Sequence, residues 1–237
     1  MKKLGIICAM KVEMKKLLSS MENVKETKVG ESTFYEGNLY DHDVVLVLCG
    51  VGKVNAAIGT QILIDRYGVE TVINSGIAGG AAEGLSIGDI VIGTDFVQHD
   101  FDVTAFGHAK GYLCTGDDDS EPTVFSADKR LVEELADAVR KISVKRKVHL
   151  GRIASGDLFI ADCRIKRKIA KKFAALATEM EGAAIAQTAS YNNVPFAVIR
   201  VISDLADGTA PESYDCFEKE SAEFSAEAVK SFVSSFK

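Results

Sequence analysis

The chain has 237 residues, with 28 lysines and arginines against 34 aspartates and glutamates, which leaves a net charge of −6. This balance argues against nucleic acid and against an anionic membrane as partners, because both are bound by concentrated positive charge. A chain of this length can bury a core without a disulfide or a metal, and three prolines with no linker-like stretch exclude a disordered chain. We therefore expect one domain spanning residues 1–237.

The cysteines indicate a reducing compartment. There are five of them, an odd number, scattered singly and without a CxxC pair. The apolar run at the N-terminus is followed at once by charged residues, which is untypical of a signal peptide. The most apolar window, Val44–Val51, is far shorter than the ~20 residues of a spanning helix. We expect a cytoplasmic protein that does not enter the membrane.

Apolar runs and helical patterns alternate along the chain. The first half predicts a strand at Leu4–Ala9, a helix at Val12–Met21, a hairpin or edge strand within Glu26–Tyr40, a strand at Val44–Cys49, a helix at Lys53–Tyr67 and a strand at Thr71–Ile73. The second half predicts a strand at Ile87–Ile92, a loop at Gly107–Ser126, a helix at Asp128–Ile142, a strand at Val148–Ala154, helices at Arg164–Phe173 and Gly182–Tyr191, a strand at Phe196–Ile202 and a helix at Ser221–Phe236. Strands that are apolar on both faces, alternating with helices, indicate an α/β protein with a largely parallel sheet covered on both sides.

Carboxylates follow three of the predicted strands, which is where ligands bind in open α/β sheets. The first is Glu13, which could equally be a glutamate that favours the positive end of a helix dipole. The second group is Glu179 and Glu181 on either side of Met180, in apolar surroundings where an acid needs a polar partner unless the turn is exposed.

The third group is Ser203 and Asp204, at the end of the most apolar strand, and it would also suit a helix N-cap. Arg200 lies inside the same strand and needs a nearby carboxylate.

Other constellations are weak. The glycine clusters at 50–53 and 76–80 match neither a phosphate-binding loop nor a dinucleotide fingerprint. No second cluster at ligand spacing accompanies His99, Asp100 and Asp102, so we expect no metal and no cofactor. There is no GxSxG elbow and no cysteine with a recognisable histidine partner. The residues alone predict an α/β protein suited to acid/base chemistry on a small polar ligand.

Seven segments in order resemble the 5'-methylthioadenosine/S-adenosylhomocysteine nucleosidases of the purine nucleoside phosphorylase superfamily. They are Gly5–Met10 with Glu13, Gly50–Val54, Asn74–Gly80, His99–Gly107, Ser155–Ile160, Glu179–Glu181 and Arg200–Asp204. The resemblance implies a three-layer α/β/α sandwich around a mixed sheet, usually as a homodimer. It implies hydrolysis of the N-glycosidic bond of an adenine nucleoside, which releases adenine and a thioribose sugar, and 5'-deoxyadenosine is a further expected substrate.

The resemblance also assigns roles to matching positions. Asp204 looks like the general acid at adenine N7, and Glu13 like the base that activates water. Glu181 resembles the ligand of the ribose hydroxyls. The remaining substrate-binding positions are Gly79, Phe159 and Ile160 around the base, Met180 beside the sugar, Arg200 steering the water, and Ser203 orienting Asp204. Because the transition state is oxocarbenium-like, an acid is needed at the base and carboxylates are needed near the sugar.

The chain departs from this pattern in three places. Ile77 stands where many relatives have a hydroxyl near the nucleophilic water. His108 stands where a tyrosine is common in the part of the pocket lent by the partner subunit, to which Val103 and Phe106 would also contribute. The stretch Gly111–Pro122 does not keep the usual loop pattern, so the preference for the 5' substituent stays open.

Three alternatives remain. A purine nucleoside phosphorylase would need positively charged ligands for phosphate, whereas Lys11, Val12 and Glu13 stand where an arginine-bearing phosphate loop would lie. A futalosine-type hydrolase of the same superfamily is the nearer alternative in substrate. A noncatalytic nucleoside-binding protein is disfavoured by the joint presence of Glu13, Glu181 and Asp204.

Overall fold

The computed structural model describes residues 3–116, 118–143, 145–205 and 210–236. The strands are β1 (Leu4–Cys8), β2 (Glu22–Val29), β3 (Ser32–Leu39), β4 (His42–Leu48), β5 (Thr71–Gly80), β6 (Ile90–Gln98), β7 (Phe125–Ser126), β8 (Val148–Ser155), β9 (Ala175–Glu179) and β10 (Phe196–Asp204). The helices are α1 (Lys11–Leu18), α2 (Lys53–Tyr67), α3 (Lys129–Ile142), α4 (Cys163–Phe173), α5 (Gly182–Tyr191) and α6 (Ala210–Val233), with a short 3-10 turn at Thr104–Phe106.

The strands form one mixed sheet in the order β10-β6-β8-β9-β5-β1-β4-β3-β2, with β7 beside β6. Parallel pairs join β4, β1, β5 and β10, while β10 and β6 run antiparallel. Since β10 also pairs with β5, the strands β5, β10, β6, β8 and β9 close on one another. This closure brings the ends of β5, β9 and β10 together, and Asp204, Gly79 and Thr178 stand side by side in register.

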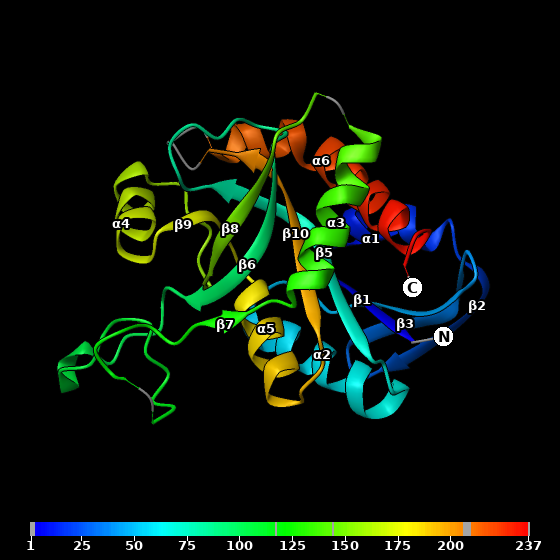
Figure 1. Ribbon diagram of the computed structural model, residues 1–237, viewed down its shortest axis with the longest axis horizontal. Helices are drawn as coiled ribbons and strands as arrows, with labels where there is room; N and C mark the ends of the chain where they lie inside the picture. The colour runs from blue at the N-terminus through cyan, green and yellow to red at the C-terminus, as the bar shows by residue number, and fades with distance from the viewer. Residues whose placement is uncertain (1–2, 117, 144, 206–209, 237) are drawn as a thin grey trace.

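Helices cover both faces of the sheet (Figure 1). The helices α1, α3 and α6 pack together on one side, and α2 and α5 pack together on the other. The helix α4 lies against β8 and β9. This arrangement confirms the expected α/β sandwich around a mixed sheet.

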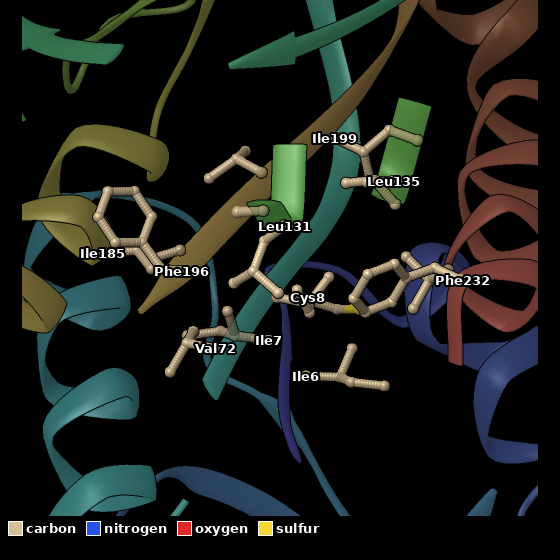
Figure 2. Packing of buried hydrophobic residues seen from close by; sticks show 14 of the residues in the cluster. Ile6, Ile7, Cys8, Val72, Leu131, Leu135, Ile185, Phe196, Ile199 and Phe232 are labelled. Atoms are coloured by element: carbon tan, nitrogen blue, oxygen red, sulfur yellow. The ribbon is translucent and has the colours of Figure 1, made fainter. Parts of the chain in front are cut away.

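The core forms because the central strands bury side chains on both faces. Every residue of β1 and of β10 is buried, as the apolar runs predict. Figure 2 shows Ile6, Ile7, Val72 and Ile199 of three adjacent strands beside side chains of the covering helices, which are Leu131, Leu135, Ile185 and Phe232. In contrast, most of β2 is exposed, and β2 and β3 form the expected polar hairpin at the edge of the sheet.

Several elements differ from the sequence prediction. The strand β5 continues through the glycine-rich segment to Gly80, because those glycines are paired with β10 and β9 rather than placed in a loop. The short strand β9 was not predicted, and α6 begins eleven residues before the expected helix at Ser221. The first turns of α6 are largely polar and exposed, so they carry no apolar periodicity. Position 117 of the predicted loop at Gly107–Ser126 lies outside the described residues. Across the described ranges, no helix has the length and apolarity needed to cross a membrane.

Candidate active site

A cavity of about 250 Å³ opens where β1, β5, β9 and β10 end. The segment at Leu158–Ile160 and the first part of α6 complete its wall. Of the predicted site residues, it brings together Glu13, Gly79, Phe159, Ile160, Met180, Glu181, Ser203 and Asp204. These residues come from five separate stretches of the chain between Glu13 and Asp204, and the fold brings them together.

Glu13 is buried and held by backbone amides. It is the third residue of α1, and its Oε2 accepts hydrogen bonds from the amides of Ala9 (2.9 Å) and Met10 (3.0 Å) at the start of the helix. Its Oε1 accepts a third from the amide of Ile77 at 3.3 Å. Burial raises the pKa of Glu13 above its ordinary value, although Arg200 and these amides act in the opposite direction. The carboxylate of Glu13 therefore combines a raised pKa with a fixed orientation.

The backbone at Gly76 leaves room for the side chains of Glu13 and Arg200, which both lie close to it. A Cβ atom at position 76 would lie 2.8 Å from Oε1 of Glu13 and 3.1 Å from a guanidinium nitrogen of Arg200. Neither side chain can move aside easily, because both are buried and hydrogen-bonded. Glycine is therefore required for this approach.

Arg200 lies behind the cavity rather than in its wall, with 1% of its surface exposed. Its guanidinium donates to the Glu179 carboxylate through Nε (3.2 Å) and Nη2, and also to Oδ1 of Asn74. The partner that the sequence required for this buried charge is thus Glu179. The Glu181 carboxylate lies 3.9 Å from the same guanidinium.

Glu179 links Arg200 to the start of α5 through hydrogen bonds. Besides Arg200, it accepts hydrogen bonds from the Ser155 hydroxyl and from the amides of Glu181 (3.2 Å) and Gly182 (2.8 Å) at the start of that helix. Both glutamates of the pair are buried, so they do not sit in an exposed turn. The sequence gives no function for Glu179, and the signal that it offers is the position of Glu179 two residues before Glu181.

Glu181 presents its carboxylate to the cavity from the N-terminus of α5. Its Oε1 accepts a hydrogen bond of 2.8 Å from the amide of Gly52, whose φ of +100° suits glycine. Burial and the neighbouring Glu179 raise the pKa of Glu181 above its ordinary value.

Asp204 also lines the cavity, at the end of β10. The Ser203 hydroxyl donates to Oδ2 of Asp204 at 3.0 Å, which fixes the rotation of the carboxyl group. A Cβ atom at position 79 would approach Oδ1 to 3.0 Å, so Gly79 leaves this face of the carboxyl group accessible from the cavity. Both Ser203 and Asp204 are buried.

Most of the remaining wall is apolar. Met180, Phe159 and Ile160 line it, together with Met10 and Val51, which lay in the quoted segments without an assigned role. Tyr214 of α6 also lines the cavity, and its ring meets Phe159 edge to face at 5.7 Å between centroids. Sequence reasoning missed Tyr214, because the first turns of α6 were not predicted to be helical.

Besides Arg200, three predicted positions do not reach this cavity. Val103, Phe106 and His108 lie on the segment around the 3-10 turn, which projects away from the sheet (Figure 1). The Phe106 side chain is 80% exposed, and His108 Nδ1 lies 2.8 Å from Oδ2 of Asp119. Within this chain, these residues contribute nothing to the cavity wall.

The charges of the wall are all of one sign. The described lining residues include Glu13, Glu179, Glu181 and Asp204 but no lysine, arginine or histidine. In the part of the chain that the structure describes, no group of three or more histidines, cysteines or acids is placed to hold a metal ion. The arrangement offers proton transfer and stabilisation of positive charge on a bound ligand.

Comparison with known proteins identifies the family of this chain. Residues 3–234 match the family model described as "Phosphorylase superfamily". A 5'-methylthioadenosine/S-adenosylhomocysteine nucleosidase of Staphylococcus aureus (strain JH9) is 40% identical over 232 residues, which cover 98% of this chain and 99% of the relative.

Two solved structures are similar over nearly their whole length. The nucleosidase of Neisseria meningitidis in complex with methylthio-immucillin-A has 42% identity and a TM-score of 0.93, with full coverage of both chains. The futalosine hydrolase of Helicobacter pylori has 31% identity and a TM-score of 0.92, covering 99% of this chain and 98% of the other. The chain belongs to the phosphorylase superfamily, among its 5'-methylthioadenosine/S-adenosylhomocysteine nucleosidases, which are N-glycosyl hydrolases.

Proposed function

We propose that this enzyme hydrolyses the N-glycosidic bond of 5'-methylthioadenosine and S-adenosylhomocysteine, and also that of 5'-deoxyadenosine, with release of adenine. The observation that carries the proposal is the convergence of Glu13, Glu181 and Asp204 on one small cavity without a cationic side chain in its described wall. A departing purine needs a proton, and the sugar left behind needs negative charge beside it.

In this mechanism Asp204 is the general acid at adenine N7. Ser203 holds one of its oxygens, and the glycine at position 79 lets the purine approach the other. Phe159 and Ile160 enclose the base. As the glycosidic bond lengthens, the proton of Asp204 moves to N7, and adenine leaves as a neutral molecule.

Glu13 takes a proton from the attacking water. Its three amide hydrogen bonds fix the carboxylate, and its raised pKa makes it a stronger base than an exposed glutamate. Glu181 binds the ribose hydroxyls next to Met180 and adds negative charge beside the oxocarbenium ion. Arg200 lies behind the wall, so its part in steering the water is electrostatic, through its positive charge near Glu13 and Glu181. Because Ile77 supplies an amide and no hydroxyl, the water depends on Glu13 for its orientation.

Water is favoured over phosphate as the nucleophile. A phosphate dianion at this place would face several carboxylates, and the guanidinium nearest to it is already bound by Glu179 and Asn74. This charge pattern argues against a phosphorylase. A futalosine-type hydrolase would share the same chemistry, but the curated relative at 40% identity is named a 5'-methylthioadenosine/S-adenosylhomocysteine nucleosidase.

We also propose that the enzyme works as a homodimer in the cytoplasm. The exposed segment with Val103, Phe106 and His108 would complete the pocket of a second copy. The Phe106 ring, which is exposed in the single chain, would then be buried against that pocket. The five cysteines are unpaired, which suits a reducing compartment.

The acid and base assignments are tested by Asp204→Asn and Glu13→Gln. Each variant should lower kcat at least ~100-fold, while calorimetry still detects binding of 5'-methylthioadenosine. Glu133→Gln, an exposed position on α3, serves as the control. Near wild-type kcat in both active-site variants would show that the assigned roles are wrong.

A further inference from the structure

We propose that Tyr214 and Glu218 of α6 form a polar contact for the 5' substituent, which makes the enzyme prefer substrates whose substituent carries an ammonium group. The inference rests on the proposed function and deepens it. It ranks the amino-bearing tail of S-adenosylhomocysteine above an uncharged alkylthio group of the same length.

The place of the 5' substituent follows by elimination. Asp204 and Ser203 mark the wall for the purine, and Glu13 and Glu181 mark the wall for the reacting carbon and the ribose hydroxyls. Thr178 stands in register with Gly79, next to Asp204, and Glu179 is bound to Arg200. The wall left over consists of Ala9, Met10, Val51, Ala78, Leu158 and Tyr214. The other five side chains are apolar, so the Tyr214 hydroxyl is the polar side-chain group that this wall offers to a substituent.

The Tyr214 hydroxyl is already oriented. It donates a hydrogen bond of 3.0 Å to Oε1 of Glu218, one helical turn further along α6, and it lies 3.2 Å from Sδ of Met10. With its single proton directed to Glu218, the tyrosine oxygen can act toward a ligand only as an acceptor. Because the Tyr214 oxygen accepts hydrogen bonds and lies next to the Glu218 carboxylate, this place favours a ligand group that donates hydrogen bonds, and a positively charged donor most of all.

The charge on Glu218 has no counter-ion within ion-pair distance among the described residues. On the neighbouring helix α1, Lys16 is already paired with Glu227 at 3.1 Å. Glu218 is half-buried, so its carboxylate is less screened than one that is fully exposed. An ammonium group at the end of a flexible substituent would supply the missing partner, whereas a methylthio group would not.

The test uses two adenine nucleosides with tails of equal length. One carries a 2-aminoethylthio group at C5', and the other carries a propylthio group, so that they differ in an ammonium against a methyl. Release of adenine is followed for both at pH 7, and the ratio of their kcat/KM values is the readout. The wild-type enzyme should favour the amino compound about fivefold, mainly through a lower KM.

Glu218→Gln should bring this ratio close to one, and Tyr214→Phe should reduce it by about half or more, because Glu218 then loses the hydrogen bond that holds it. The matched control is Asp215→Asn, which removes the same charge from an exposed position next to Tyr214 and should leave the wild-type ratio. A wild-type ratio near one, an unchanged ratio in Glu218→Gln, or an equal loss in the control would overturn the inference while the hydrolase assignment stands. If the wild type cleaved neither compound and did not cleave 5'-methylthioadenosine, the proposed function would fail and the inference with it.

Discussion

Replacing Glu179 with glutamine should destabilise the enzyme strongly, although this side chain has no proposed part in the chemistry. The carboxylate is the main counter-charge of Arg200, which is almost completely buried. Glutamine keeps the shape, but it removes the charge and places an amide among groups that donate hydrogen bonds, which are Arg200, Ser155 and the amides at the start of α5.

Breaking a buried ion pair from one side costs about 3–5 kcal/mol. The lower end applies here, because Glu181 lies 3.9 Å from the guanidinium and offsets part of the lost charge. A loss of about 3 kcal/mol in a chain of this length corresponds to a fall of about 6–12 °C in Tm.

Thermal unfolding followed by circular dichroism at one fixed protein concentration measures this fall. Glu133→Gln removes the same charge from an exposed position on α3 and should shift Tm by less than about 2 °C. If Glu179→Gln lowered Tm no more than the control does, the Glu179–Arg200 ion pair would not contribute about 3 kcal/mol to stability.

Three further outcomes follow from the site. Burial raises the pKa values of both Glu13 and Glu181. Because both carboxylates must be charged, kcat/KM should be lost as the pH falls, with a midpoint above the ordinary glutamate pKa of 4.5. A kcat/KM that stayed constant down to pH 4.5 would contradict this. Gly76→Ala should lower kcat about 10–100-fold in a folded protein, because the new methyl displaces the Glu13 carboxylate; wild-type kcat would count against the proposed base. Phe106→Ala should raise the KM for 5'-methylthioadenosine severalfold if a second copy borrows this ring, and an unchanged KM would remove it from the pocket.

The central strands and most helices could be predicted from the sequence because their burial is local information. The strand β10 is buried along its whole length, and its apolar run predicts this directly. The strand β9 could not be predicted, because its five residues gain their place only from pairing with β5 and β8. The early start of α6 was missed because its polar first turns show no apolar period.

The site was partly predictable for the same reason. Glu13 and Asp204 follow apolar strands, so their position at one edge of the sheet follows from the α/β pattern. The partnership of Arg200 with Glu179 depends on the closure of the sheet between β10 and β5, which the linear pattern does not contain. Tyr214 reaches the cavity from a helix whose first turns gave no signal.

The central claim is that water, activated at this cavity, cleaves the bond between adenine and the sugar. It is tested by incubating the purified enzyme with 5'-methylthioadenosine in buffer with and without phosphate, and identifying both products by chromatography and mass. Hydrolysis should release adenine equally in the two buffers, together with free methylthioribose. Adenine release that requires phosphate and yields a sugar 1-phosphate, or no release at all, would contradict it.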